Sequence, residues 1–259
     1  MTGHRVVLRP RSLLESCDLT SIFIRVHQGY FARLLPWVIV PALGAYLLHV
    51  LGDWRPARAL LLEVAVTNFT ADIYALLCGD LMLQPTTSLT AIQIRFLKSL
   101  PRYVFTRALL TATLFVSFGL TFSRAMFAPE AALLERGGVR AAWSRSGALM
   151  SATPGRWIAF GVIAGLLLLF GAAAMETLRY AVREMFGLSQ SPLSAMKDHM
   201  SWAPFLGIAL AQPFLVAARF LLYIDCRTRR EGWDLQVQFN ALAISSNSHL
   251  RSGPPAEAA

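Results

Sequence analysis

The segment WIAFGVIAGLLLLFGAAAMETL, from Trp157 to Leu178, carries no charged residue before Glu176. About 20 mostly apolar residues are enough for a helix to cross a bilayer, and a helix is favoured there because it satisfies its own backbone hydrogen bonds. Four further apolar runs have similar lengths: Leu34–Leu51, Ala59–Leu83, Tyr103–Ala125 and Trp202–Ile224. We therefore expect an all-α fold, a polytopic bundle of membrane helices.

The composition also indicates a protein whose main solvent is lipid. Hydrophobic residues make up 55% of the 259 residues, charged residues make up 15%, and the mean hydropathy is +0.50, which lies outside the range of soluble domains. The net charge of +9 would suggest nucleic-acid binding in a soluble domain. Here the basic residues flank the apolar runs, as charges that orient membrane helices do. We expect membrane lipids as partners, and no nucleic acid.

The distribution of basic residues predicts the number of crossings. Five crossings from a cytoplasmic N-terminus leave 11 basic residues inside and 10 outside, which is no bias. If Tyr103 to Leu134 folds as a hairpin that turns near Ser117–Gly119, the counts become 16 inside and 5 outside. The positive-inside rule therefore favours six spans with both termini cytoplasmic, with five spans as the alternative. The hairpin is short for two full spans, so we expect it to be thinned, re-entrant or shielded by protein.

Short basic amphipathic stretches precede the apolar runs and form a degenerate repeat: Ser12–Phe31, Thr87–Leu100, Gly138–Met150 and Ser191–Met200. In the first, Leu19, Ile22, Phe23, Val26 and Tyr30 recur at helical spacing, which predicts a helix lying in the membrane interface.

The expected organisation has four parts. A cytoplasmic amphipathic segment covers 1–33, the transmembrane bundle 34–224, a cytoplasmic juxtamembrane segment 225–244, and a disordered tail 245–259. All but two of the 24 basic residues are arginine, which suggests a GC-rich bacterial genome and hence the bacterial inner membrane. The three widely spaced cysteines predict reduced thiols.

Six ionisable residues inside the apolar runs are candidates for charges in the membrane interior. They are Glu63, Asp72, Asp80, Arg107, Arg124 and Arg219, and the last five form the candidate intramembrane ionic core. Charged groups at this depth are costly and should be paired or line a cavity. We expect Asp72 to pair with Arg124, and Asp80 with Arg107 or Arg219. Ionic stitching between helices is favoured over a proton or ion relay.

The sequence predicts no catalytic residues, metal site or cofactor. It contains no phosphate-binding loop, no zinc-protease motif and no nucleophile elbow, and its five histidines are dispersed. We therefore expect a protein that is not an enzyme.

The last apolar run continues into LYIDCRTRREGWDL, from Leu222 to Leu235, the most densely charged segment of the chain. A continuing helix would pair Asp225 with Arg229 and Arg227 with Glu231 at i,i+4. The candidate cytoplasmic interaction motif consists of Tyr223, Asp225, Arg227, Arg229, Glu231, Gly232 and Asp234.

This motif resembles the ending Y-x-D-x-R-x-R-x-E-G-x-D-L of bacterial multi-pass proteins similar to the glycerophosphoryl diester phosphodiesterase membrane domain. Residues 8–13, Arg124–Glu135 and Ala141–Ser146 also look like that family. The resemblance covers the membrane part only and implies a six-helix bundle with cytoplasmic interfacial helices. It implies little about activity, because the chain lacks the length and the acidic metal-site motif of the soluble phosphodiesterase barrel.

Three functions fit these patterns. The first is a non-enzymatic inner-membrane scaffold or assembly component that binds lipid or a protein partner at its cytoplasmic face. The alternative is a transporter or transporter subunit that uses a polar intramembrane core. The third is a lipid-modifying membrane enzyme.

Overall fold

The computed structural model describes residues 12–52, 54–83, 87–116, 125–135, 138–151, 155–187 and 201–231. Throughout these ranges the regular structure is helical and no strand is present, which confirms the all-α expectation. The helices are α1 (Leu13–Val26), α2 (Gln28–Leu34), α3 (Pro36–Leu51), α4 (Pro56–Ala71), α5 (Ile73–Leu83), α6 (Leu89–Val116), α8 (Ala128–Leu134), α9 (Val139–Ser151), α10 (Arg156–Met185) and α12 (Trp202–Glu231).

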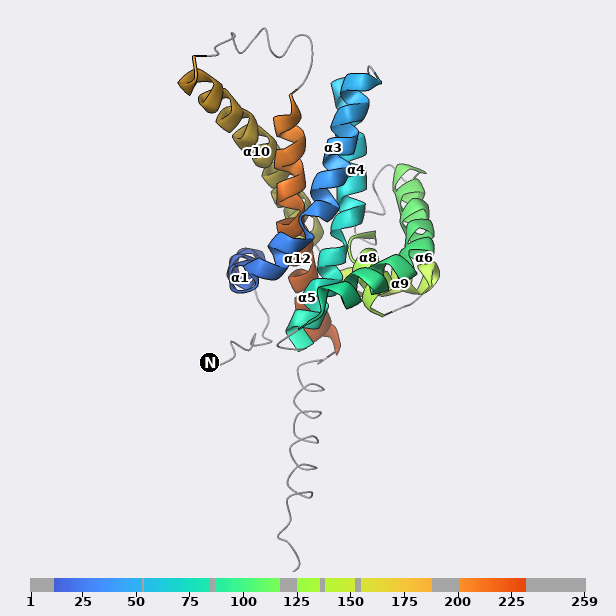
Figure 1. Ribbon diagram of the computed structural model, residues 1–259. Helices are drawn as coiled ribbons and strands as arrows, with labels where there is room; N and C mark the ends of the chain where they lie inside the picture. Colours follow the sequence, from blue (N-terminus) through green and yellow to red (C-terminus); the bar gives the residue numbers. More distant parts are fainter. Residues whose placement is uncertain are drawn as a thin grey trace, which may run out of the picture.

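Four segments of the described chain are long and apolar enough to cross a membrane: Gln28–Leu51, Pro56–Met82, Arg156–Met185 and Trp202–Arg230. Figure 1 shows α3, α4 and α12 side by side, with α10 leaning away from them. The α3–α4 turn and the end of α10 lie at one end of the bundle, here called the upper end. The lower end holds α1, α5, α9 and the end of α12.

None of these four segments lies in the predicted hairpin between Tyr103 and Leu134. Helix α6 runs along the lower end and then turns upward (Figure 1), and it contains Pro101, the residue type that most often kinks a helix. Helix α8 has seven residues, most of them buried. The turn expected near Ser117–Gly119 lies outside the described residues.

Local sequence explains where the helices begin and break. The Ser12 hydroxyl accepts a hydrogen bond from the Glu15 N–H at 3.2 Å, which caps α1. Pro36 and Pro56 occupy the first positions of α3 and α4, where a missing N–H costs nothing. At the turn between these helices, His49 Nδ1 lies 2.6 Å from the carbonyl oxygen of Trp54.

Helix α1 lies across the bundle at the lower end (Figure 1). Its apolar residues lie partly on the face that packs against the bundle and partly on the exposed face. Phe23 is buried together with Ser16 and Thr20, whereas Ile22 and Val26 are exposed. The small polar side chains therefore face the bundle, and part of the apolar stripe faces outward.

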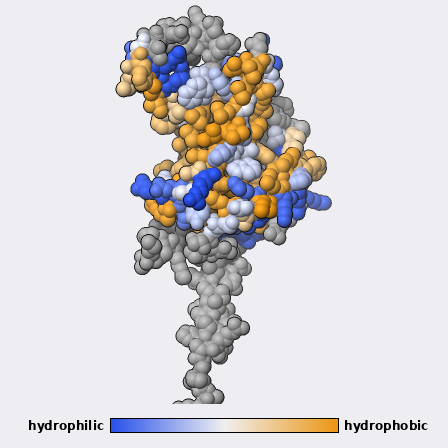
Figure 2. Space-filling view, in the orientation of Figure 1, coloured by the Kyte–Doolittle hydropathy of each residue, from blue (hydrophilic) through white to orange (hydrophobic). Residues whose placement is uncertain are grey.

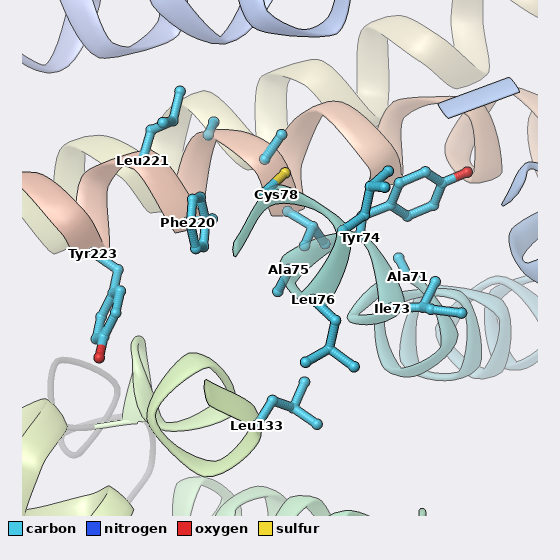
Figure 3. Packing of buried hydrophobic residues seen from close by; sticks show 14 of the residues in the cluster. Ala71, Ile73, Tyr74, Ala75, Leu76, Cys78, Leu133, Phe220, Leu221 and Tyr223 are labelled. Atoms are coloured by element: carbon cyan, nitrogen blue, oxygen red, sulfur yellow. The ribbon is translucent and has the colours of Figure 1, made fainter. Parts of the chain in front are cut away.

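The main hydrophobic core joins α5, α8 and α12. Figure 3 shows Leu76 of α5 and Leu133 of α8 pointing toward each other, with Phe220 of α12 near Cys78. The buried Tyr74 hydroxyl donates to the carbonyl oxygen of Phe31 at 3.2 Å, which ties α5 to α2. The three cysteines are free, as expected.

Helices α10 and α12 cross at two glycines that the sequence pattern did not single out. A Cβ atom added to Gly207 would lie 2.1 Å from the carbonyl oxygen of Gly171, so only glycine allows this backbone approach. By contrast, Gly165 forms a G-x-x-x-G pattern with Gly161 in α10, but a Cβ on Gly165 would meet nothing within 4 Å. Because Val162, Leu166 and other apolar residues of α10 are exposed, the glycine crossing is a main attachment of α10 to the bundle.

The surface follows the pattern expected of a membrane protein. Figure 2 shows apolar side chains over the middle of the bundle, a broad band of hydrophilic side chains at the lower end and a smaller hydrophilic group near the upper end. The end of the bundle domain expected at residue 224 is not marked by a helix end, because α12 continues to Glu231. The expected disordered tail, 245–259, lies outside the described residues.

The glycine crossing yields a stability prediction. Gly207→Ala should lower the free energy of unfolding by about 1–3 kcal/mol, because the added methyl group overpacks the contact with Gly171. Thermal unfolding of the detergent-solubilised protein measures the effect. Gly165→Ala is the matched control and should be neutral or slightly stabilising. Equal stabilities of the two variants would contradict the crossing.

Candidate functional site: a buried ionic core

Asp72 lies where the second candidate span is interrupted. It forms the C-terminal cap of α4, its N–H points to the carbonyl of Phe69, and α5 begins at the next residue. The side chain is fully buried. A break of this kind in a membrane helix is tolerated where protein surrounds it, and here the break aims a carboxylate into the bundle.

Two arginines from other helices bind this carboxylate. Arg107 Nη2 of α6 lies 2.8 Å from Oδ2, and Arg219 Nη2 of α12 makes an ion pair with Oδ1. The hydroxyl of Tyr103, one turn before Arg107, also donates to Oδ2. Arg107 further donates to the side-chain oxygen of Asn68, one turn before Asp72. Asp72 is thus held by donors from two other helices.

Glu130 extends the network to a fourth segment. Its carboxylate accepts from Arg219 Nε at 2.5 Å, and its side chain is fully buried in α8. The cluster therefore contains two carboxylates and two guanidinium groups, whose charges balance one another. Buried charges are tolerated when they are paired and hydrogen bonded in this way. We call Asn68, Asp72, Tyr103, Arg107, Glu130 and Arg219 the ionic core.

The structure changes the expected pairing of these residues. Asp72, Arg107 and Arg219 do come together, but Asp80 does not bind either arginine, so that pairing is wrong. Asp80 instead binds Arg95 of α6 at 2.6 Å, in a partly exposed pair. The expected partner of Asp72, Arg124, lies outside the described residues.

Sequence reasoning missed Tyr103 and Glu130 as members of the core. Tyr103 entered the sequence analysis only as the first residue of an apolar run, although it stands one helical turn before Arg107. Glu130 was one acid in the apolar segment Ala125–Leu134, and the same rule of costly buried charge that selected Asp72 would have selected it.

A second charged group joins α8, α9 and α12 nearer the lower end. Glu135, which follows α8, accepts a hydrogen bond from the Tyr223 hydroxyl at 2.5 Å. Arg145 of α9 and Arg227 of α12 bind the same carboxylate at 3.2 and 3.6 Å. Tyr223 points out of α12 toward this region in Figure 3.

A third charged cluster, centred on Asp225 of α12, joins the start of α10 to α12. Asp225 is bound by Arg156 at 2.5 Å and by Arg229 at 3.0 Å. The i,i+4 pair of Asp225 and Arg229 is therefore confirmed. In the candidate cytoplasmic interaction motif, Tyr223 and Asp225 are buried, Arg227 is partly exposed and Arg229 is exposed. The Glu231 side chain, Gly232 and Asp234 lie outside the described residues.

The chemistry of these groups is that of ionic cross-links between helices. Each carboxylate of the three clusters is bound by at least one arginine. Within the described ranges, no group of three or more histidine, cysteine or acidic side chains is placed to hold a metal ion. Comparisons with protein-family models, curated proteins and solved structures gave no match to this chain.

Removing the central charge should be far more costly than removing the peripheral one. Asp72→Asn removes one of the two carboxylate charges that balance the buried guanidinium groups of Arg107 and Arg219. It should lower the free energy of unfolding by about 3–5 kcal/mol. Asp80→Asn removes a partly exposed pair and should cost at most about 1 kcal/mol. Denaturant unfolding in mixed micelles compares the two variants. A loss for Asp72→Asn no larger than for Asp80→Asn would show that the ionic core is not stabilising.

Proposed function

We propose that the protein is a non-enzymatic scaffold or assembly component of the bacterial inner membrane, with a basic lower end that binds anionic lipid headgroups. The observation that carries this proposal is a set of exposed basic side chains from four helices at that end. They are Arg25 of α1, Arg33 of α2, Lys98 and Arg102 of α6, and Arg140 of α9. Within the described residues none of them makes an ion pair, so their charges are available to a ligand.

Arg102 of α6 lies beside the start of α9, the helix that carries Arg140. Arg102 Nη2 would lie 3.8 Å from a Cβ atom on Gly138, two residues before Arg140 in the chain. Exposed guanidinium groups on two neighbouring helices can together bind a phosphate, which accepts several charge-assisted hydrogen bonds at once.

The same arrangement supports the expected topology as part of the proposal. Helices α1 and α9 and the first part of α6 lie at the lower end of the bundle (Figure 1), where amphipathic helices would rest at the headgroup level. If that end is cytoplasmic, its basic residues satisfy the positive-inside rule and both termini are cytoplasmic. In this arrangement α6 and α8 form a protein-shielded hairpin in place of the third and fourth spans of the six-span prediction.

The ionic contacts favour a scaffold over a transporter. Arginines bind both oxygens of the Asp72 carboxylate. In the candidate cytoplasmic interaction motif, Tyr223 binds Glu135 at the end of α8, and Asp225 binds Arg156 of α10. Both sets fix helices to one another. The resemblance to the glycerophosphoryl diester phosphodiesterase membrane domain stays part of the proposal, and it fits a helix bundle of this kind without its own chemistry.

One observation favours the alternative, a transporter or transporter subunit. The helix break at Asp72 is the kind of discontinuity that transporters use at midplane binding sites. Transport would require the ionic core to open to water. Cysteine accessibility at Asn68→Cys tests this: protection from a membrane-impermeant thiol reagent is expected of the scaffold, and labelling from both sides of the membrane supports the transporter.

Lipid binding can be tested with a matched pair of charge reversals. The combined change Arg102→Glu with Arg140→Glu should weaken binding of phosphatidylglycerol at least about tenfold, because each basic residue near an anionic surface contributes about 1 kcal/mol. Native mass spectrometry with phosphatidylglycerol and phosphatidylethanolamine measures it.

The control is Arg55→Glu with Arg58→Glu, two exposed residues at the upper end. This control should retain most of the preference for phosphatidylglycerol. Equal losses in the two double variants would contradict a lipid site at the lower end.

A further inference from the structure

Glu63 is a buried acid without a counter-charge. Helix α4 buries one stripe at four-residue spacing, Ala59, Glu63, Thr67 and Ala71. Glu63 is fully buried on this stripe, and neither of its carboxyl oxygens has a hydrogen-bond partner among the described residues. It stands seven residues from the start of α4, which is about 10 Å along the helix and therefore inside the apolar layer.

The other buried acids of the described chain differ from Glu63 in one respect. Asp72, Glu130 and Asp225 each bind an arginine. Asp72 is nine residues further along the same chain, about 13 Å away if the rise is helical. Arg219 of α12 and Arg107 of α6, which reach the end of α4, are both occupied by the ionic core.

A neighbouring polar group is also short of donors. Gln212 of α12 is fully buried, and its Nε2 donates to the Thr67 hydroxyl at 3.4 Å. That hydroxyl donates in turn to the backbone carbonyl of Glu63 at 2.7 Å. Gln212 Oε1 has no hydrogen-bond partner among the described residues. Pro213, the next residue, has no N–H and so removes the helical donor for the carbonyl of Ala209.

We propose that Glu63 and Gln212 form a proton-binding site in the membrane interior, in which Glu63 holds the proton. The region has several buried oxygen acceptors and few donors. A carboxylic acid supplies one O–H donor and removes the charge, whereas a carboxylate there would be desolvated without compensation. This inference does not depend on the scaffold function, because it concerns the upper half of the bundle and a different ligand.

The other titratable groups on the helices packed against α4 do not remove the need for this proton. His49 of α3 directs Nδ1 to the carbonyl of Trp54. On α12, Arg219 and Asp225 are held in their own ion pairs. The proton-binding site is therefore separate from the ionic core.

Infrared spectroscopy detects the bound proton directly. The full-length protein in lipid nanodiscs at neutral pH should show the carbonyl stretch of an un-ionised carboxylic acid, which moves when H₂O is replaced by D₂O. Glu63→Gln, which keeps the shape of the side chain, should lose this band. The control Asp80→Asn, which removes a paired acid from the same span, should keep it. Identical carbonyl bands in the wild type and Glu63→Gln would overturn the proposal.

Carbodiimide labelling of the wild-type protein gives a test that needs no variant to fold. The acid O–H of a protonated carboxyl group adds across one C=N bond of dicyclohexylcarbodiimide, the proton passes to nitrogen, and the O-acylisourea rearranges to a stable N-acylurea. Peptide mass mapping should place this adduct on Glu63 and not on Asp72 or Glu130. No adduct on Glu63, or protection of Glu63 by sodium but not by potassium, would overturn the proposal, the second outcome indicating a metal-cation site.

Discussion

The charge of Asp72 must be balanced in a place where water cannot do so, and the arrangement of the lower half of the bundle follows from that requirement. A carboxylate at the α4–α5 break is stable only if donors reach it from other helices. Arg107 brings α6 to it, and Arg219 brings α12. Arg219 then needs a second acid, which α8 provides as Glu130. One buried charge thus determines which face each of three other segments turns inward.

The remaining contacts complete the bundle by different means. At the lower end, Glu135 and Asp225 fix α8, α9 and the start of α10 to α12. Near the middle of α10, backbone contact between Gly171 and Gly207 brings α10 against α12 where no charge is available. Directional ionic contacts therefore set the orientation of the inner helices, and close packing attaches the outer one.

Much of the fold could be predicted from the sequence, because long apolar runs and flanking charges act locally. The helical class followed from runs such as Trp157–Leu178, and the extension of α12 through Asp225 followed from i,i+4 pairing. The partners of the buried charges could not be predicted in the same way. Asp80 was expected to bind Arg107 or Arg219, but it lies near the end of α5, where Arg95 of α6 binds it. Helix order in space, which the sequence pattern does not contain, decides such pairs.

The lipid-facing surface and the interior also differ in what a sequence can say about them. Exposed residues of α10 such as Leu166 and Phe170 need only be apolar. Buried polar residues such as Tyr103 and Glu130 are recognisable once a partner helix is known, because each satisfies a group on another segment. Candidate sites in membrane bundles are therefore best sought by asking which buried charges lack a partner.

The central claim is that Asp72 and Arg219 stabilise the bundle as a pair, and a double-mutant cycle measures this most directly. The free energies of unfolding of Asp72→Asn, Arg219→Gln and the double variant are compared with the wild type in the same micelles. We expect the double variant to lose less stability than the sum of the single variants, with a coupling of about 1–3 kcal/mol. Additive losses, within about 0.5 kcal/mol, would contradict the claim that this buried pair organises the bundle.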